Sequence, residues 1–259
     1  MRRGLARSRG EARELVEAGQ VTVDGLVARK AATAVEDRAD LAVAADGPRW
    51  VGRAAHKLDH AFDHWADDGL TASGRHCLDV GASTGGFTQV LLHRGADHVV
   101  ALDVGRDQLV AELRKHPRVT ERSGTSVRDV TPDELGTFDL VVVDLSFISL
   151  TLVLASIADL TREGGGVVVL VKPQFEVGRG RLSKNGIVID PRHRRRALTD
   201  VVAAAGAVGL GVHGLIRSPI SGGEGNTEYL LWARSGVSGT MDPDAVHATV
   251  RDLAKEGRA

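Results

Sequence analysis

The chain has 259 residues, 42% of them hydrophobic, which is enough for one large domain and a small appendage. No segment has the length of a membrane-spanning helix or the apolar stretch of a signal peptide, and one cysteine excludes a disulfide framework, so we expect a cytoplasmic protein without a membrane partner. Although the net charge is −1, the N-terminal segment is basic, because residues 1–30 hold seven basic and four acidic side chains. This excess of positive charge indicates a polyanionic partner for the N-terminal segment. The aromatic content of 3% favours phosphate and shape contacts over stacking on an aromatic platform.

The front of the chain has the pattern of a small α+β unit. A capping-box spacing at Ser8 predicts a helix over residues 8–19, and Asp24-Gly25 predicts a tight hairpin turn. A last short strand is expected over residues 40–43. We therefore expect three parts: a small domain at 1–44, a linker at 45–53 and a large domain at 54–259.

Strand and helix patterns alternate throughout the large domain. Strands are predicted at 77–80, 98–103, 118–120, 139–144, 166–172, and around 210–212 and 228–232. Helices are predicted at 54–65, from 87, at 109–115, at 150–160, and from 191 after a cap at Asp190. Such alternation predicts a parallel, doubly wound α/β sheet that binds its ligand at the carboxyl ends of the strands.

A glycine-rich turn follows the first of these strands. Asp79 precedes Gly81, and Gly85-Gly86 come later, so the spacing differs from the dinucleotide fingerprint G-x-G-x-x-G. An acid beside a loop without phosphate-binding spacing suits a ligand with an ammonium group, such as the methionine end of S-adenosylmethionine. Alone, the turn fits any nucleotide-like ligand.

Charged residues end several strands of the predicted sheet. Asp79, Asp103, Asp144 and Lys172 each lie at the carboxyl end of an apolar run. Four at one edge of a sheet make a candidate site. Asp103 is placed to accept hydrogen bonds from ribose hydroxyls, a role shared by nicotinamide and S-adenosylmethionine binders.

The stretch GLARSRGEARELVEAGQVTVDGLVARK resembles the S4 RNA-binding module. The resemblance implies that a basic helix and hairpin present cations to structured RNA; the alternative is a solvated helix face. Such modules usually open with a further helix, so either the true start lies upstream or the module is clipped. The implied RNA-binding residues are Arg3, Arg7, Arg9, Arg13, Arg29 and Lys30.

Four blocks together resemble the TlyA family of ribosomal RNA 2′-O-methyltransferases, historically named haemolysins. The blocks are DVGASTGGF from Asp79, DLSFIS from Asp144, KPQFE from Lys172, and NTEY from Asn226. The resemblance implies a Rossmann-like, FtsJ-like methyltransferase domain behind the S4 module, with S-adenosylmethionine as cofactor. The family usually has an asparagine near the adenine, where this chain has Ser126. The implied cofactor-binding residues are Asp79, Gly81, Ser83, Thr84, Gly85, Gly86, Phe87, Asp103, Ser126 and Asp144.

The family's catalytic tetrad falls on Lys57, Asp144, Lys172 and Glu228. A ribose 2′-hydroxyl is a poor nucleophile until its proton is removed. Lys172 is the candidate base, because partial desolvation and a neighbouring cationic Lys57 both favour the neutral amine. Asp144 and Glu228 would orient the lysines and the ribose. The alternative is that these residues form peripheral ion pairs.

A basic cluster begins the helix after Asp190. Cations in a first helical turn oppose the macrodipole, at about 0.3–1 kcal/mol each, and a bound phosphate would reverse this cost. We therefore expect RNA-backbone contacts from the cluster, with a solvated face as the alternative. The cluster comprises Arg192, His193, Arg194, Arg195 and Arg196.

The spacing of the histidines shows no metal site. We therefore expect no bound metal, and we expect a monomer.

The sequence thus predicts S-adenosylmethionine-dependent methylation of a cytidine 2′-hydroxyl in 16S or 23S ribosomal RNA, or both. Two alternatives are a non-catalytic RNA-binding or ribosome-assembly factor and a membrane-lytic protein. The intact tetrad opposes the first, and the lack of an amphipathic basic helix with aromatic anchors opposes the second. A nicotinamide oxidoreductase is disfavoured by the glycine spacing.

Overall fold

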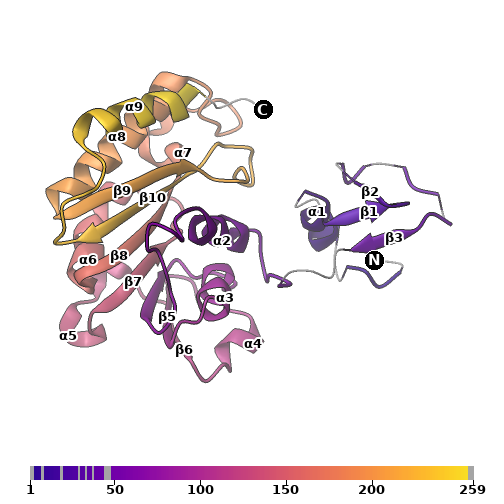
Figure 1. The fold of residues 1–259 in the computed structure, drawn as a ribbon, viewed down its shortest axis with the longest axis horizontal. Helices are drawn as coiled ribbons and strands as arrows, with labels where there is room; N and C mark the ends of the chain where they lie inside the picture. Colours follow the sequence, from indigo (N-terminus) through magenta and orange to yellow (C-terminus); the bar gives the residue numbers. More distant parts are fainter. Residues whose placement is uncertain are drawn as a thin grey trace. The chain divides into compact units, whose positions relative to one another are not determined.

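The protein folds into two compact units, Met1–Arg53 and Ala54–Ala259, in a computed structural model (Figure 1). The structure describes residues 3–6, 9–17, 20–28, 30–32, 34–36, 38–43 and 48–255. The expected helix cap at Ser8, the expected helix end at Gly19, the last residue of the expected small domain and residues 45–47 of the expected linker lie outside these ranges.

The first unit packs one helix with a small antiparallel sheet. The helix is α1 (Arg9–Glu17), and the sheet has the order β2 (Leu26–Val27), β1 (Val21–Val23), β3 (Leu41–Val43). Val23 lies opposite Leu26, which confirms the predicted hairpin. The Asp24 carboxylate accepts a hydrogen bond from the amide of Asp40 at 2.7 Å, so the hairpin turn is tied to the start of β3.

The second unit is built on a seven-stranded sheet. Its strands are β4 (His76–Val80), β5 (His98–Asp103), β6 (Val119–Ser123), β7 (Phe138–Val143), β8 (Thr161–Val171), β9 (Leu210–Arg217) and β10 (Tyr229–Ser235). The order across the sheet is β6-β5-β4-β7-β8-β10-β9. The first five strands in this order are parallel, which confirms the predicted α/β class. β10 runs antiparallel to both β8 and β9, and this corrects the expectation of an all-parallel sheet.

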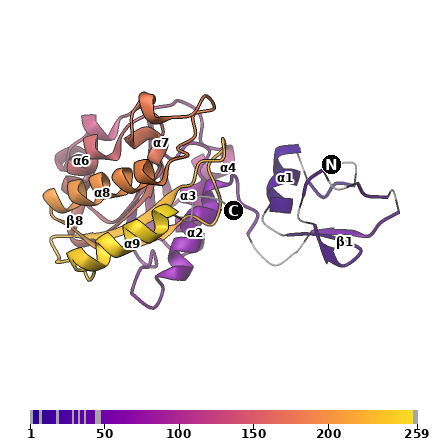
Figure 2. The ribbon, with the colours of Figure 1, turned by 90° about the horizontal axis from the view of Figure 1, so that it is seen from above.

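Helices cover both faces of this sheet. They are α2 (Ala54–His64), α3 (Gly86–His93), α4 (Ala111–Arg114), α5 (Pro132–Leu135), α6 (Leu154–Leu160), α7 (Pro173–Glu176), α8 (Pro191–Ala207) and α9 (Pro243–Lys255). α2 and α3 pack together over one face, while α6, α8 and α9 lie over the other (Figures 1 and 2). Among the described residues of this unit there are also three single 3₁₀ turns: η1 (Val127–Asp129), η2 (Leu150–Leu152) and η3 (Arg179–Arg181).

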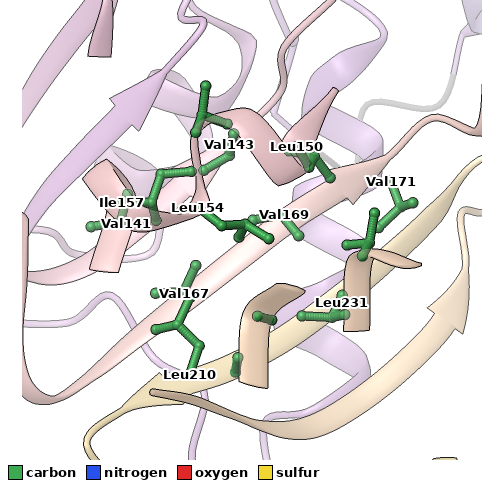
Figure 3. Close-up of a cluster of buried hydrophobic side chains, with 14 of the residues drawn as sticks. Val141, Val143, Leu150, Leu154, Ile157, Val167, Val169, Val171, Leu210 and Leu231 are labelled. Carbon is green, nitrogen blue, oxygen red and sulfur yellow. The ribbon is translucent and has the colours of Figure 1, made fainter. Parts of the chain in front are cut away.

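The central strands are apolar on both faces because both are covered. Val141 and Val143 of β7 and alternate valines of β8 meet Leu154 and Ile157 of α6 in one fully buried cluster (Figure 3). β7 ends at Val143 and β8 at Val171, where the chain must leave the sheet. This rigid core therefore fixes the positions of the polar residues that follow each strand.

The start of α8 agrees with the sequence prediction, whereas the segment 150–160 differs from it. The Asp190 side chain accepts a hydrogen bond from the Arg192 amide, and Pro191 begins α8, as the sequence predicted. The expected helix over 150–160 is instead divided into η2 and α6, because Val153 between them has a non-helical φ of −125°.

The single cysteine, Cys77, lies in β4 and has no exposed surface. Burial raises the pKa of its thiol to about 12. The thiol is therefore protonated and inaccessible at neutral pH.

Candidate active site

Two buried ion pairs form the centre of the site. Lys172 Nζ lies 2.6 Å from Asp144 Oδ1 and donates a hydrogen bond to Ser146 Oγ at 3.0 Å. Lys57 Nζ lies 2.5 Å from Glu228 Oε2. Both lysine side chains and Glu228 are buried, and all three line one cavity of about 810 Å³. The structure therefore brings the four predicted tetrad residues together as two pairs.

The sheet topology explains why these residues meet. Asp144 and Lys172 directly follow the neighbouring parallel strands β7 and β8, so both lie at the carboxyl edge. β10 is antiparallel and pairs Tyr229 with Val171, so its beginning lies at that same edge. Glu228 precedes β10 and therefore faces Lys57, which α2 supplies from its first turn.

Two polar side chains that sequence reasoning did not single out organise the walls of this cavity. Asn226 is 3% exposed; its Oδ1 accepts from the amide of Val188 and its Nδ2 donates to the carbonyl of Gly186. Gln174 of α7 donates to Glu228 Oε1 at 3.4 Å. The NTEY block signals the position of Asn226, but its partners lie 38 and 40 residues away in sequence.

Glu176 connects the segment after β7 to α7. Its carboxylate accepts hydrogen bonds from Ser149 Oγ at 2.5 Å and from the amide of Leu150 at 3.0 Å. Burial raises the pKa of this carboxyl group. The loop that follows Asp144 is thus anchored to the helix that follows Lys172.

Phe147 protrudes from that loop. Its side chain is 91% exposed, and its φ of 64° lies in the left-handed region that a non-glycine residue seldom adopts. Its ring lies 5.1 Å from the ring of Phe175, and both rings line the cavity that holds the two lysines. Because only 3% of the residues are aromatic, the sequence did not indicate a stacking platform, and Phe147 was not predicted as a site residue.

The glycine-rich turn holds a fully buried carboxylate. Asp79 Oδ2 accepts a hydrogen bond from Thr88 Oγ1 at 2.6 Å, whereas Oδ1 has no hydrogen-bond partner among the described residues. Burial raises the pKa of Asp79 to about 7, and the nearby Asp144 carboxylate adds to the rise. A buried acceptor without a donor is costly, so Oδ1 fits a cationic or N–H-bearing ligand group.

Two glycines shape this turn. Gly81 has a φ of 87°, and a Cβ there would lie 2.5 Å from the Asp144 carbonyl oxygen. Gly85 has a φ of 102°, and a Cβ there would collide with the side chain of Leu113. Both positions therefore require glycine, for the backbone conformation and for the space.

The other expected cofactor residues divide between the turn and its neighbours. Asp103 accepts backbone hydrogen bonds from the amides of Ser83 and Gly105, at 2.8 and 2.7 Å, so its carboxylate is held beside the turn. Ser126 accepts from the amide of Arg128 and caps η1. Gly86 and Phe87 are buried at the start of α3, and Phe87 is 2% exposed. Ser83 and Thr84 are exposed.

The predicted RNA-binding arginines of α8 differ in their exposure to solvent. Arg192, Arg195 and Arg196 are exposed on α8. The structure corrects the prediction that Arg194 contacts RNA. Its side chain is 3% exposed and donates hydrogen bonds to the carbonyls of Val188, Ile189 and Ala254. Its position on the buried face of α8 makes it a structural anchor rather than a nucleic-acid contact.

In the first unit, Arg9, Arg13 and Lys30 are exposed, and Arg3 donates to the carbonyl of Ala39 at 2.5 Å. Arg7 and Arg29 lie outside the described residues. Within the described ranges there is no group of three acidic, histidine or cysteine side chains arranged to hold a metal ion. Nor does that part of the chain contain a helix long and apolar enough to cross a membrane.

Comparison with known proteins identifies the class of both units. The family described as FtsJ-like methyltransferase matches residues 50–235, and the S4 domain family matches residues 2–40. The chain is therefore an FtsJ-like methyltransferase preceded by an S4 domain.

Individual relatives narrow this class. The chain is 48% identical over 258 residues to the 16S/23S rRNA (cytidine-2′-O)-methyltransferase TlyA of Mycobacterium tuberculosis, covering 97% of this chain and 95% of the relative. It is 36% identical to the 23S rRNA (cytidine-2′-O)-methyltransferase TlyA of Campylobacter jejuni, covering 71% and 70% of the two chains. The solved structure of a putative hemolysin from Streptococcus thermophilus superimposes with a TM-score of 0.75 at 35% identity, covering 99% of this chain and 92% of that one. The protein belongs to the TlyA family.

Proposed function

We propose that this methyltransferase transfers the methyl group of S-adenosylmethionine to the 2′-hydroxyl of a cytidine in ribosomal RNA. The observation that carries the proposal is the buried Lys172 amine, held by Asp144 and Ser146 in the same cavity as the Lys57–Glu228 pair. The two relatives above carry names with this activity, one for both subunits and one for the 23S rRNA. We expect the enzyme to work in the cytoplasm.

The glycine-rich turn fits the methyl donor. Asp79 Oδ1 lacks a donor within the described chain, and an ammonium group satisfies it. Gly81 and Gly85 let the turn adopt positive φ values and pack closely against Asp144 and Leu113. Asp103 accepts from ribose hydroxyls, and Ser126 is assigned to the adenine. When bound, S-adenosylmethionine supplies an electrophilic sulfonium methyl group at the carboxyl edge of the sheet.

In this proposal Lys172 removes the proton of the target 2′-hydroxyl at Nζ. Its side chain is almost fully buried, and it lies against Asp144 and Ser146 in the cavity that also holds Lys57. Asp144 orients the amine toward the ribose. Glu228 holds Lys57 and faces the ribose.

We further propose that the target base stacks on Phe147. An exposed ring beside the tetrad offers a face to a base that has left its helix, and aromatic stacking stabilises such a base by about 1–3 kcal/mol. Phe147→Ala is expected to raise the KM for RNA about tenfold and to leave S-adenosylmethionine binding unchanged. Steady-state methyl transfer and calorimetric titration of the cofactor measure the two quantities. Phe147→Trp is the control and should retain activity; equal loss in both variants would contradict stacking.

The proposed function is tested by mapping ribose methylation in 16S and 23S rRNA by mass spectrometry. Cells that lack the gene should lose one or more 2′-O-methylcytidines, and the wild-type gene should restore them. A gene carrying Lys172→Ala should not restore them. Unchanged methylation on loss of the gene, together with no transfer of labelled methyl to purified subunits, would contradict the proposal.

A further inference from the structure

Basic side chains are concentrated in one segment of an otherwise acidic unit. Residues 54–259 contain 23 basic and 26 acidic side chains, yet residues 179–196 contain seven basic and one acidic side chain. Like charges repel, so such a cluster is unfavourable unless a polyanion neutralises it. The cluster spans η3 and the first turns of α8.

Part of this cluster lines a hollow, here called the arginine groove, of about 610 Å³. All of its lining side chains are charged or polar: Arg181, Arg192, His193, Arg195, Arg196, Thr199 and Asp200. Arg192 pairs with Asp190 at 2.8 Å and Arg196 with Asp200 at 3.4 Å. These carboxylates offset two of the four arginines, so the groove keeps a positive excess. A surface whose side chains carry cationic groups and a hydroxyl suits phosphates.

The buried Arg194 fixes the orientation of this surface. Its guanidinium binds the carbonyls of Val188 and Ile189 before α8 and of Ala254 in α9. α8 therefore cannot rotate without breaking buried hydrogen bonds. The groove is a rigid face, which lowers the entropic cost of binding a partner.

The arginine groove adjoins the candidate active site. η3 is a single turn; Arg179 at its start lines the cavity with the two lysines, and Arg181 at its end lines the groove. A chain that enters the active-site cavity and continues across η3 reaches the groove directly. Its repeating negative charges would then meet the excess cations.

We propose that the arginine groove binds consecutive phosphates of the same RNA strand whose ribose enters the active-site cavity. This inference rests on the proposed function and adds a second docking surface, on the methyltransferase unit itself, to that of the S4 domain. Phosphate contacts carry no sequence information, so the groove sets the position of the strand while the cavity selects the nucleotide.

The test removes the two groove arginines in Arg195→Ala/Arg196→Ala. Binding to ribosomal RNA fragments is measured by fluorescence anisotropy over a series of salt concentrations, and methyl transfer is measured on the same RNA. We expect the affinity at 0.1 M salt to fall roughly 30-fold and the salt slope to decrease by about 1.5, as for two lost phosphate contacts. The KM for RNA should rise, while kcat at saturating RNA, cofactor affinity and thermal unfolding stay unchanged.

Two further variants separate charge from structure. Arg195→Lys/Arg196→Lys keeps the charges and should retain the wild-type salt slope. Arg162→Ala removes an exposed arginine at the start of β8, at the opposite edge of the sheet, and should change neither slope nor KM. If the double alanine variant keeps the wild-type affinity and slope while the wild type methylates RNA, the groove inference alone is wrong. If the wild type transfers no methyl group to any ribosomal RNA, the proposed function is wrong.

Discussion

Lys172→Arg should slow methyl transfer by several orders of magnitude although it preserves the charge of the site. An arginine can still pair with Asp144, but it does not lose its proton in proteins, so it cannot accept one from the 2′-hydroxyl. Loss of a general base lowers kcat by about 10²–10⁴. Single-turnover transfer of labelled methyl to purified ribosomal subunits measures this loss, and calorimetry should show unchanged cofactor binding.

The lysine of the second ion pair provides a matched comparison for this result. Lys57 pairs with Glu228 and has an electrostatic part in the proposed mechanism, so Lys57→Arg should retain much more activity than Lys172→Arg. Lys184 is exposed, and Lys184→Arg should behave as wild type. Near wild-type rates in Lys172→Arg would exclude Lys172 as the base.

Asp79→Asn should stabilise the free protein and weaken cofactor binding together. Burial raises the pKa of Asp79 to about 7 from an ordinary value of 3.8, so the native state resists ionisation of this group. The resulting decrease in the free energy of unfolding is absent below pH 4 and grows as the pH rises to 7. Above pH 7 it is complete, on the order of 4 kcal/mol. Removing the charge should therefore raise the Tm of the free protein, more at pH 8 than at pH 5.

The same substitution removes the partner of the ammonium group. A charged hydrogen bond contributes about 1.5–3 kcal/mol, so the Kd for S-adenosylmethionine should increase about 10- to 100-fold. In the wild type, affinity should increase from pH 6 to pH 8 as Asp79 ionises, and in Asp79→Asn this dependence should disappear. Asp97→Asn, at an exposed aspartate, is the control. A wild-type affinity in Asp79→Asn would remove Asp79 from the cofactor site.

Local sequence patterns were enough to predict the parallel part of the fold. β4, β5, β7 and the second half of β8 are apolar runs, and the polar residue that ends or follows each run marks the carboxyl edge of the sheet. Asp144 and Lys172 could therefore be placed at one edge from sequence, because parallel neighbours end on the same side. The Asp190-Pro191 helix start depends on the same kind of local information.

What sequence could not supply was the direction of β10 and the rotation of α8. An apolar run such as Tyr229–Trp232 is the same pattern in either direction, yet only the antiparallel arrangement brings Glu228 beside Lys57. Likewise, five adjacent basic and histidine residues on α8 give no indication that Arg194 alone faces the interior. The exposure of Phe147 depends on a left-handed backbone conformation that its side chain does not favour.

The buried Cys77 makes this enzyme suited to site-specific labelling. It is the only cysteine of the chain, has no exposed surface, and is protonated at neutral pH. A maleimide dye should therefore leave the wild-type protein unmodified under native conditions. Cysteines introduced one in each unit would be the only reactive thiols, so energy transfer between two dyes can report how the S4 domain moves relative to the methyltransferase domain during RNA binding.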